Sequence, residues 1–252
     1  MSFVHLHNHT HYSLLDGLSN PSKLVTKVKE LGMDSIAITD HGNMYGVIEF
    51  YKECKKQGIK PIIGCEVYVA ENDRTNKSLK DNRTFHITLL AMNNGGYKNL
   101  CTLLSEANLT GFYYKPRIDF ALLEKYNEGL ICLSGCLGGE LSQAVLENDG
   151  SKAVDIAIKY KKLFGDRYYI ELQRHENSQD QNKVTPKLIE LAESLAIDYV
   201  ATSDSHYILK EDNEIHDILL AIQTQTDLDD KDRMTMKGDD FSIQSPEEMA
   251  EK

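Results

Sequence analysis

The sequence predicts an α/β fold in which seven strands form a distorted, TIM-like barrel. Seven short apolar runs of strand length alternate with stretches whose apolar residues recur at helical spacing. Residue types that bind metal ions recur near the ends of these runs, as expected where the strands of a barrel converge on one rim. We therefore expect parallel strands joined by right-handed crossovers.

The chain opens with the first expected strand. Val4 and Leu6 alternate with His5, His7 and His9, so the imidazoles share one face. Residues two apart on a strand lie about 7 Å apart at the α-carbon, from which both rings can reach one metal ion. The alternative is a half-buried strand with solvated rings or an affinity tag, but a tag would not be interleaved with aliphatic residues.

The next elements follow from local signals. Asn20 before Pro21 is typical of a helix start, and Gly32 of a helix end. Apolar runs predict six further strands, at 35–39, 60–69, 86–91, 130–134, 168–172 and 198–202. Apolar residues at helical spacing predict helices at 21–31, 47–57, 97–109, 141–146, 153–164, 188–195 and 215–222. The polar stretch 71–84 is expected to be a surface loop.

Two units are expected along the chain. Residues 1–226 would form the barrel. Residues 227–252 are rich in charge and lack a hydrophobic repeat, so we expect them to be a connecting segment.

Composition limits the classes of function. The 252 residues can bury a sizeable core without covalent cross-links. Lys and Arg number 28 and Asp and Glu 39, and the net charge of −11 argues against general gripping of nucleic acid. A nucleic acid substrate stays open, because divalent ions reverse the charge of an acidic pocket. Five cysteines without a Cys-x-x-Cys pair indicate a reducing cytoplasm. We expect no membrane span and no leader.

Potential metal ligands occur at nearly every expected strand. Each is a weak signal alone, because His86 could be a core histidine and Glu66 could belong to a buried ion pair. Several imidazoles and a carboxylate within aliphatic strands are costly to bury unless a cation satisfies them. With Asp16 they suit a hydrolytic centre of two or three ions rather than a closed structural site.

Several runs resemble the polymerase and histidinol phosphatase (PHP) family. They are 6–10 (LHNHT), 38–42 (ITDHG), 64–68 (GCEVY), 134–139 (SGCLGG) and 202–206 (TSDSH). More narrowly, the chain resembles the N-terminal PHP domains of bacterial DNA polymerase III alpha subunits in the runs 12–17 (YSLLDG), 111–117 (GFYYKPR), 238–241 (GDDF) and 245–249 (SPEEM). The resemblance covers essentially the whole chain.

The resemblance implies a barrel that holds two or three divalent ions, of zinc, manganese or iron, on nine ligands. The nine positions are filled by His7, His9, Asp16, His41, Glu66, His86, Cys136, Asp204 and His206, without departure from the family pattern. By analogy Glu66 bridges two ions. The first ion would also take His7, His9 and Asp204, and the second His86 and Cys136. The third would take Asp16, His41 and His206.

The resemblance also implies phosphoester hydrolysis, with His7, His9, Glu66 and Asp204 as the catalytic residues. In metal-loaded polymerase members it implies 3′–5′ exonuclease proofreading of a DNA primer end. The partners would be the polymerase domains of the same subunit, toward which residues 227–252 would lead, and other replisome subunits. No run resembles the palm aspartates of a polymerase, so we expect no nucleotide incorporation. The alternatives are a non-catalytic scaffold stabilised by metal, and a free-standing phosphatase of the histidinol phosphate type.

Other polar residues have less specific roles. Candidates for steering phosphate and stacking a frayed base are Lys115, Arg117, Tyr113 and Tyr114. The alternative for this segment is a basic patch that faces the polymerase domains. Histidines outside the family pattern, expected to be structural or solvated, are His5, His11, His175 and His216.

Overall fold

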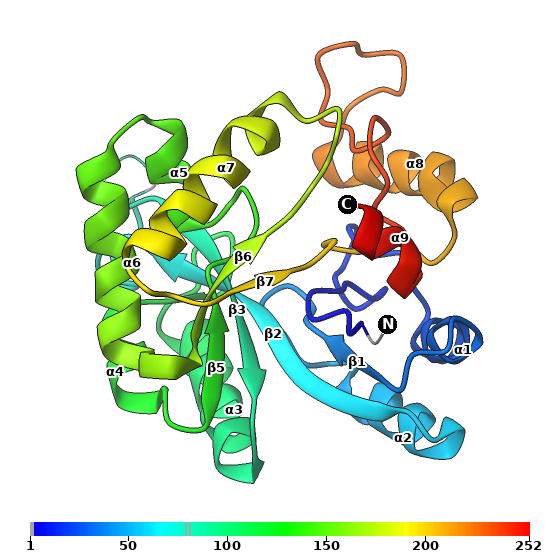
Figure 1. Ribbon diagram of the computed structural model, residues 1–252, viewed down its shortest axis with the longest axis horizontal. Helices are drawn as coiled ribbons and strands as arrows, with labels where there is room; N and C mark the ends of the chain where they lie inside the picture. The colour runs from blue at the N-terminus through cyan, green and yellow to red at the C-terminus, as the bar shows by residue number, and fades with distance from the viewer. Residues whose placement is uncertain (1–2, 79, 81) are drawn as a thin grey trace.

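The computed structural model describes residues 3–78, 80 and 82–252. Its centre is a curled seven-stranded sheet with helices packed around the outside (Figure 1). The strands are β1 (Ser35–Ile38), β2 (Lys60–Ala70), β3 (Thr84–Ala91), β4 (Arg117–Ile118), β5 (Leu130–Leu133), β6 (Tyr168–Leu172) and β7 (Tyr199–Ala201). They follow the order β1-β2-β3-β5-β6-β7, with β4 paired to β2. The predicted α/β class and the distorted barrel are confirmed.

Strand β3 runs against its neighbours, so the expectation of parallel pairing throughout is wrong. Tyr68 of β2 pairs with His86 of β3, and Leu89 of β3 pairs with Cys132 of β5, both antiparallel. The other paired strands are parallel. The reason is the connection 71–83, whose described residues form no crossover helix that could return the chain for a parallel pair. Two residues of this predicted loop, 79 and 81, lie outside the described part.

The opening segment is not a regular strand, which corrects a second expectation. It forms an isolated bridge between Asn8 and Ser205. The Asn8 side-chain amide donates to the carbonyl oxygens of His5 and Ala37, and such side-chain bonds replace a backbone ladder. The segment still lies between β1 and the chain after β7, because Ala37 N–H donates to His5 O and His9 N–H to Ser205 O. It closes the barrel where a strand was expected, and β4 is the seventh strand.

Helices cover the outside of the barrel (Figure 1). They are α1 (Pro21–Glu30), α2 (Val47–Gln57), α3 (Asn94–Leu109), α4 (Phe120–Tyr126), α5 (Glu140–Leu146), α6 (Gly150–Phe164), α7 (Gln179–Ser194), α8 (Asn213–Thr224) and α9 (Pro246–Glu251). Asn20 caps α1 as expected, since its side chain accepts from the N–H groups of Ser22 and Lys23. The helices α4 and α9, of seven and six residues, were not predicted from the sequence.

Two apolar clusters hold the helices to the sheet. The larger includes Leu89 of β3, Leu103 of α3 and Leu188 of α7, all fully buried. The smaller lies under α1 and α2 and includes Leu24 and Phe50. Alternation along β3 puts polar residues on the opposite face of this strand.

On that opposite face, the character of β3 changes along the strand. Leu90 belongs to a third apolar cluster. His86 and Thr88 share its face because they are four and two residues away, respectively. Since β3 is antiparallel, its polar beginning lies at the end of the barrel where β2 and β5 finish.

Residues 227–252 return to the barrel and end in α9. Ile243 is buried in the cluster under α1 and α2. The Gln244 carbonyl oxygen lies 2.8 Å from His5 Nε2, so this segment packs against the opening one. The expected boundary at 226/227 stays a prediction.

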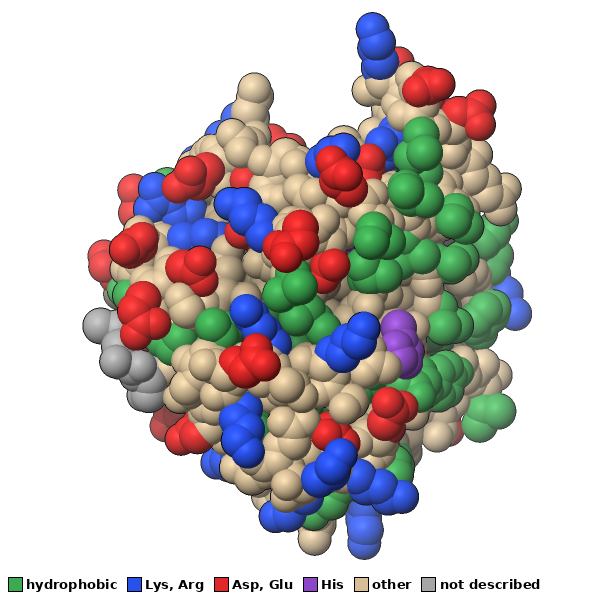
Figure 2. Space-filling view, turned by 90° about the vertical axis from the view of Figure 1, so that its right-hand side faces the viewer, with side chains coloured by type: hydrophobic (Ala, Val, Ile, Leu, Met, Phe, Trp, Pro, Cys, Tyr) green, Lys and Arg blue, Asp and Glu red, His purple; other side chains and the backbone are tan. Residues whose placement is uncertain are grey.

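One face of the molecule exposes apolar side chains (Figure 2). On α8, Ile215, Ile218 and Ile222 are 57%, 46% and 59% exposed and follow one helical stripe. In the part of the chain that is described, no helix is long and apolar enough to cross a membrane.

Candidate metal centre

The nine expected ligands meet at one rim of the barrel. They come from the opening segment, the turn after β1, strand β2, the start of β3, the turn after β5 and the chain after β7. Each has a ligand atom within 3.5 Å of a ligand atom of another member. His86 reaches this rim from the start of its strand because β3 is antiparallel.

Two histidines face the same two carboxylate oxygens. Nε2 of His7 lies 3.4 Å from Glu66 Oε2 and 3.3 Å from Asp204 Oδ1. The corresponding distances from His9 Nε2 are 3.3 and 3.1 Å. Ligand atoms about 2.0–2.1 Å from a tetrahedral ion lie about 3.3–3.4 Å from one another. Four of the six distances among the ligand atoms of these four residues are therefore near the value expected around a tetrahedral divalent ion.

The other oxygen of Glu66 faces a nitrogen and a sulfur. Oε1 of Glu66 is 2.9 Å from His86 Nδ1 and 3.5 Å from Cys136 Sγ. The sulfur and this nitrogen are 4.0 Å apart. Imidazole, thiolate and carboxylate together suit zinc or another borderline-soft ion. Glu66 thus turns one oxygen to each of two ligand groups, the arrangement of a bridging carboxylate.

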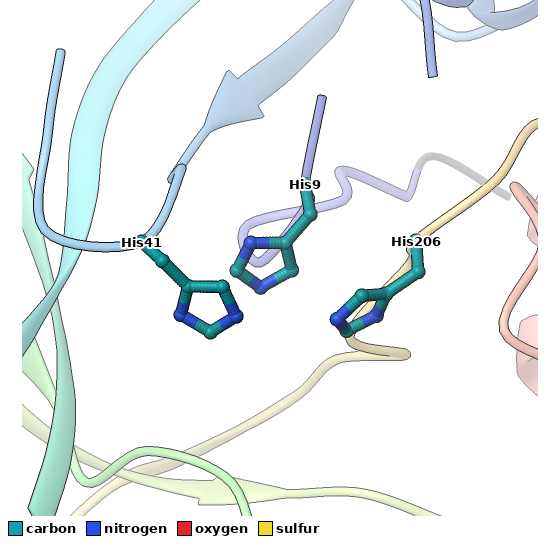
Figure 3. A group of neighbouring side chains, drawn as sticks. All are labelled: His9, His41 and His206. Carbon is teal, nitrogen blue, oxygen red and sulfur yellow. The ribbon is translucent and has the colours of Figure 1, made fainter. Parts of the chain in front are cut away.

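A third group forms around Asp16. Its Oδ2 lies 2.9 Å from His41 Nε2 and its Oδ1 lies 3.2 Å from His206 Nε2. The His9 ring stands between the other two imidazoles, with centroid distances of 4.1 Å to His41 and 4.4 Å to His206. The three rings come from distant segments and converge on one space (Figure 3). This group adjoins the first through His9, and His41 Nδ1 lies 2.7 Å from Oε2 of the bridging Glu66.

Unpartnered buried atoms test whether metal fits here. His7 Nε2, His41 Nδ1 and Glu66 Oε2 are buried and make no hydrogen bond of acceptable geometry in the described structure, although His41 Nδ1 and Glu66 Oε2 lie 2.7 Å apart as an ion pair. Buried polar atoms are normally satisfied, because leaving one unpaired costs free energy. A cation held by these donor atoms would satisfy all three. The residues present therefore fit divalent metal ions.

Carboxylates set the protonation of the imidazoles. Burial alone would lower the pKa of His41, but the charges of Glu66 and Asp16 outweigh burial and raise this pKa to about 10. Burial would also lower the pKa of His7, but the charges of Asp204 and other carboxylates outweigh burial and raise this pKa well above its usual range. The carboxylates of the rim thus favour positive charge on their neighbours, and in the absence of an ion protons on the imidazoles supply it. A metal ion that binds there must displace protons.

Two backbone conformations place ligands. Gly135 precedes Cys136 with φ 85°, and a Cβ there would lie 2.5 Å from the His86 carbonyl oxygen. Only glycine allows this close approach of the turn to β3. Asp204 has φ 52°, a left-handed conformation that few non-glycine residues adopt. The His206 Nδ1–H group donates to the Asp204 carbonyl oxygen over 2.7 Å and helps to hold it.

Sequence reasoning missed the carboxylate behind His7. Glu171 Oε1 lies 2.6 Å from His7 Nδ1, and both side chains are buried. Thr202 Oγ1 and Gln173 Nε2 also donate to this oxygen. The available signal was an acidic residue inside the apolar run of β6.

A second missed network lies behind His9. The Ser13 hydroxyl donates to Asp40 over 2.8 Å, and its oxygen lies 2.9 Å from His9 Nδ1. With its hydrogen used on Asp40, Ser13 accepts from the Nδ1–H group of His9. His9 Nε2 therefore keeps its lone pair for an ion. The only sequence signal for Asp40 was its position directly before the expected ligand His41.

The two basic residues of the segment 111–117 differ in their burial. Arg117 is fully buried and donates to the carbonyl oxygens of Gly111, Arg74 and Asn76. The expectation that it steers phosphate is wrong, because its guanidinium joins two loops instead. Lys115 is exposed near the rim.

The four histidines outside the family pattern have other surroundings. His5 and His216 are buried, and the Nε2 atom of each lies within hydrogen-bond distance of a backbone carbonyl oxygen. His175 is buried and stacks on Phe241 at 4.2 Å, whereas His11 is exposed. Among the described residues, none of these four histidines belongs to a group of three or more potential metal ligands.

Comparison with known proteins places this geometry in context. The profile of the PHP domain family matches residues 5–175. The chain is 48% identical to DNA polymerase III subunit alpha of Treponema pallidum, over 100% of this chain, and 46% identical to that of Borreliella burgdorferi, over 99%. It spans 22% of the length of each of these relatives.

Two solved structures share the fold. One, from Bifidobacterium adolescentis and provisionally classed as a metal-dependent phosphoesterase, has a TM-score of 0.51 and 13% identity, over 82% of this chain and 88% of that one. The other, an amidohydrolase from Chromobacterium violaceum, has a TM-score of 0.50 and 14% identity, over 81% and 87%. At these identities the likeness concerns the fold alone.

Proposed function

Because this chain belongs to the PHP domain family, we propose that it hydrolyses phosphoesters with divalent metal ions and removes nucleotides from the 3′ end of a DNA primer. The observation that carries the proposal is the set of near-tetrahedral distances among His7, His9, Glu66 and Asp204. The similarity to DNA polymerase III alpha subunits supports DNA as the substrate. The reaction would be 3′–5′ exonuclease proofreading.

The side chains of the rim would hold the ions and the others would orient them. When bound, divalent ions supply a hydroxide nucleophile near neutral pH and offset the charge of the phosphate and the leaving oxygen. Glu171 holds Nδ1 of His7 and Ser13 holds Nδ1 of His9. Both Nε2 atoms therefore face the carboxylates of Glu66 and Asp204. The chain thereby fixes its ligands before any ion binds.

Elemental analysis combined with digestion of a 3′-labelled primer tests the proposal. Asp204→Asn removes one of the two carboxylates that face His7 and His9. We expect lower ion occupancy and at least a hundredfold slower digestion, by analogy with the loss of other electrostatic groups in active sites. Asp119→Asn is the matched control, since Asp119 is buried, caps α4 and pairs with Arg74 rather than with any of the nine expected ligands in the described structure. Equal digestion by the wild type and Asp204→Asn would refute the assignment.

The alternative is a metal-stabilised scaffold. It is favoured by the burial of the ligands, because His7, His9 and Glu66 are at most 1% exposed. If added manganese or zinc raises the melting temperature while neither DNA nor nitrophenyl phosphate is hydrolysed, the scaffold is the better account. Hydrolysis of nitrophenyl phosphate without digestion of DNA would instead favour a small-molecule phosphatase.

The partners are also a proposal. We infer that polymerase domains of the kind present in the longer relatives pack against this domain, and that the exposed stripe of Ile215, Ile218 and Ile222 on α8 contributes to the contact. Other replisome subunits are further candidates. The cytoplasmic location expected from the cysteines stays a prediction.

A further inference from the structure

We propose that a pocket beside the metal-binding rim holds the terminal nucleotide of a single DNA strand. Phe112 would stack on the base and Lys115 would face its phosphate. The inference rests on the proposed function and adds the side chains that select an unpaired end. It also replaces Arg117, Tyr113 and Tyr114 as the residues expected to contact DNA.

The pocket opens directly from the candidate metal centre. It has a volume of about 190 Å³, and its walls include Asp16, His41, Tyr68 and Lys115. Pockets for drug-sized ligands measure about 300–1,000 Å³, so this one suits part of a nucleotide rather than a larger molecule. A group bound there lies against two of the nine expected ligands.

The outer edge of the pocket is apolar and exposed. Leu14, Tyr45 and Phe112 line it and are 69%, 67% and 52% exposed. Exposed aromatic rings beside a polar site offer a stacking surface, which any base can use because every base has a π-face. Tyr113 and Tyr114 are not among the lining residues of the described structure.

Lys115 supplies the only lysine or arginine side chain among the residues described as lining this pocket. Its Nζ lies 5.3 Å from the centroid of the Tyr68 ring, a cation–π contact that orients the side chain. The Tyr68 ring also stacks with the His41 ring, at a centroid distance of 5.8 Å. The Tyr68 ring thus contacts both the Lys115 ammonium group and His41 of the candidate metal centre. It forms no ion pair with any described carboxylate, so its charge is available to a phosphate.

The arrangement favours an unpaired end over a duplex end. A paired terminal base is held against its neighbour and its complement, whereas a frayed base can turn one face to Phe112. The lysine then meets the adjacent phosphate, and the linkage lies toward Asp16 and His41. A mismatched primer end, which frays more readily, would enter more often.

Fluorescence of a terminal 2-aminopurine tests the subsite without requiring turnover. The probe is a short single-stranded DNA with 2-aminopurine at its 3′ end and a terminal phosphorothioate linkage, titrated with the 252-residue chain in manganese at several salt concentrations. We expect the wild type to quench the probe and Phe112→Ala to weaken its binding about tenfold, the loss of one stacked base. Lys115→Met should reduce the slope of log affinity against log salt by about 0.7, the value for one phosphate contact on a single strand.

Matched controls lie at the opposite end of the barrel. Tyr199 and Lys60 are exposed at the starts of β7 and β2, and Tyr199→Ala and Lys60→Met should leave affinity and salt slope unchanged. Nitrophenyl phosphate hydrolysis reports separately on the metal centre. Wild-type quenching that is lost in Phe112→Ala supports the subsite even if no substrate is hydrolysed, in which case only the proposed function fails. Absence of quenching by the wild type, or variants that match it in affinity and slope, would overturn the subsite.

Discussion

Nδ1 of His7 and Oε1 of Glu171 lie 2.6 Å apart, and both side chains are fully buried. The contact fixes the imidazole so that Nε2 points at Glu66 and Asp204. A carboxylate behind a ligating histidine also increases the basicity of the ligand nitrogen. Glu171 is therefore a positioning residue, and His7 is the one expected ligand that it contacts in the described structure.

Glu171→Gln should weaken metal binding without removing a ligand. The loss of an outer carboxylate typically reduces metal affinity about 10- to 100-fold. Competition with a chromophoric chelator measures the change. Asp119→Asn, which removes a buried carboxylate elsewhere, should leave the affinity unchanged. An affinity in Glu171→Gln equal to that of the wild type would contradict the role.

Folding stability should depend on pH through His5. Burial lowers the pKa of this histidine to about 4, and the hydrogen bond to Gln244 only partly opposes burial. An unfolded chain has a histidine pKa of about 6.5, so it takes up the proton first as the pH falls. The contribution of neutral His5 is complete above about pH 6.5 and declines toward pH 4, by up to about 1.4 kcal/mol per pH unit.

Urea unfolding in the presence of a chelator measures this effect. We expect the free energy of unfolding of the wild type to fall more steeply from pH 7.5 to pH 5 than that of His5→Gln. His216 has its pKa lowered to about 4 by burial and by His206, and remains in both proteins, so it cancels from the difference. A difference that does not vary with pH would contradict the prediction.

Cys136 should select among metals. A thiolate favours zinc or cadmium over manganese, because soft ligands favour softer ions. Cys136→Ser should therefore reduce cadmium affinity by a larger factor than manganese affinity. Sulfur-to-metal charge-transfer absorption on adding cadmium should disappear in this variant and persist in Cys101→Ser. If the absorption persists in Cys136→Ser, this sulfur is not a ligand.

Asp217 should hold the segment after α8 in a pH-dependent way. Arg233 donates to both oxygens of Asp217, and these bonds lower the pKa of Asp217 to about 2. Because the folded pKa lies below the unfolded value of about 3.9, the contribution is present above about pH 4 and is lost as the pH falls toward 2. At pH 7, Asp217→Asn should speed tryptic cleavage after Lys231, while Asp229→Asn should not. Equal cleavage rates in both variants would contradict the contact.

Local patterns identified most elements because burial imposes a period on the sequence. The apolar run of β6 matched its strand, and Asn20 marked the start of α1. The direction of β3 escaped because a strand has the same alternation in either direction. His86 held a clue, since it opens its run whereas His41, Cys136 and Asp204 follow theirs. Arg117 escaped because a basic residue in a loop carries no sign of burial.

The sequence by itself determined the kinds of ligand, their order along the chain and the α/β class, because these depend on side-chain chemistry and local period. Only the tertiary structure decided that β3 reverses, that the opening segment closes the barrel through backbone bonds and the side chain of Asn8, and that Glu171 stands behind His7. These features join residues far apart in the chain, and the free energy of such contacts is set by packing in three dimensions.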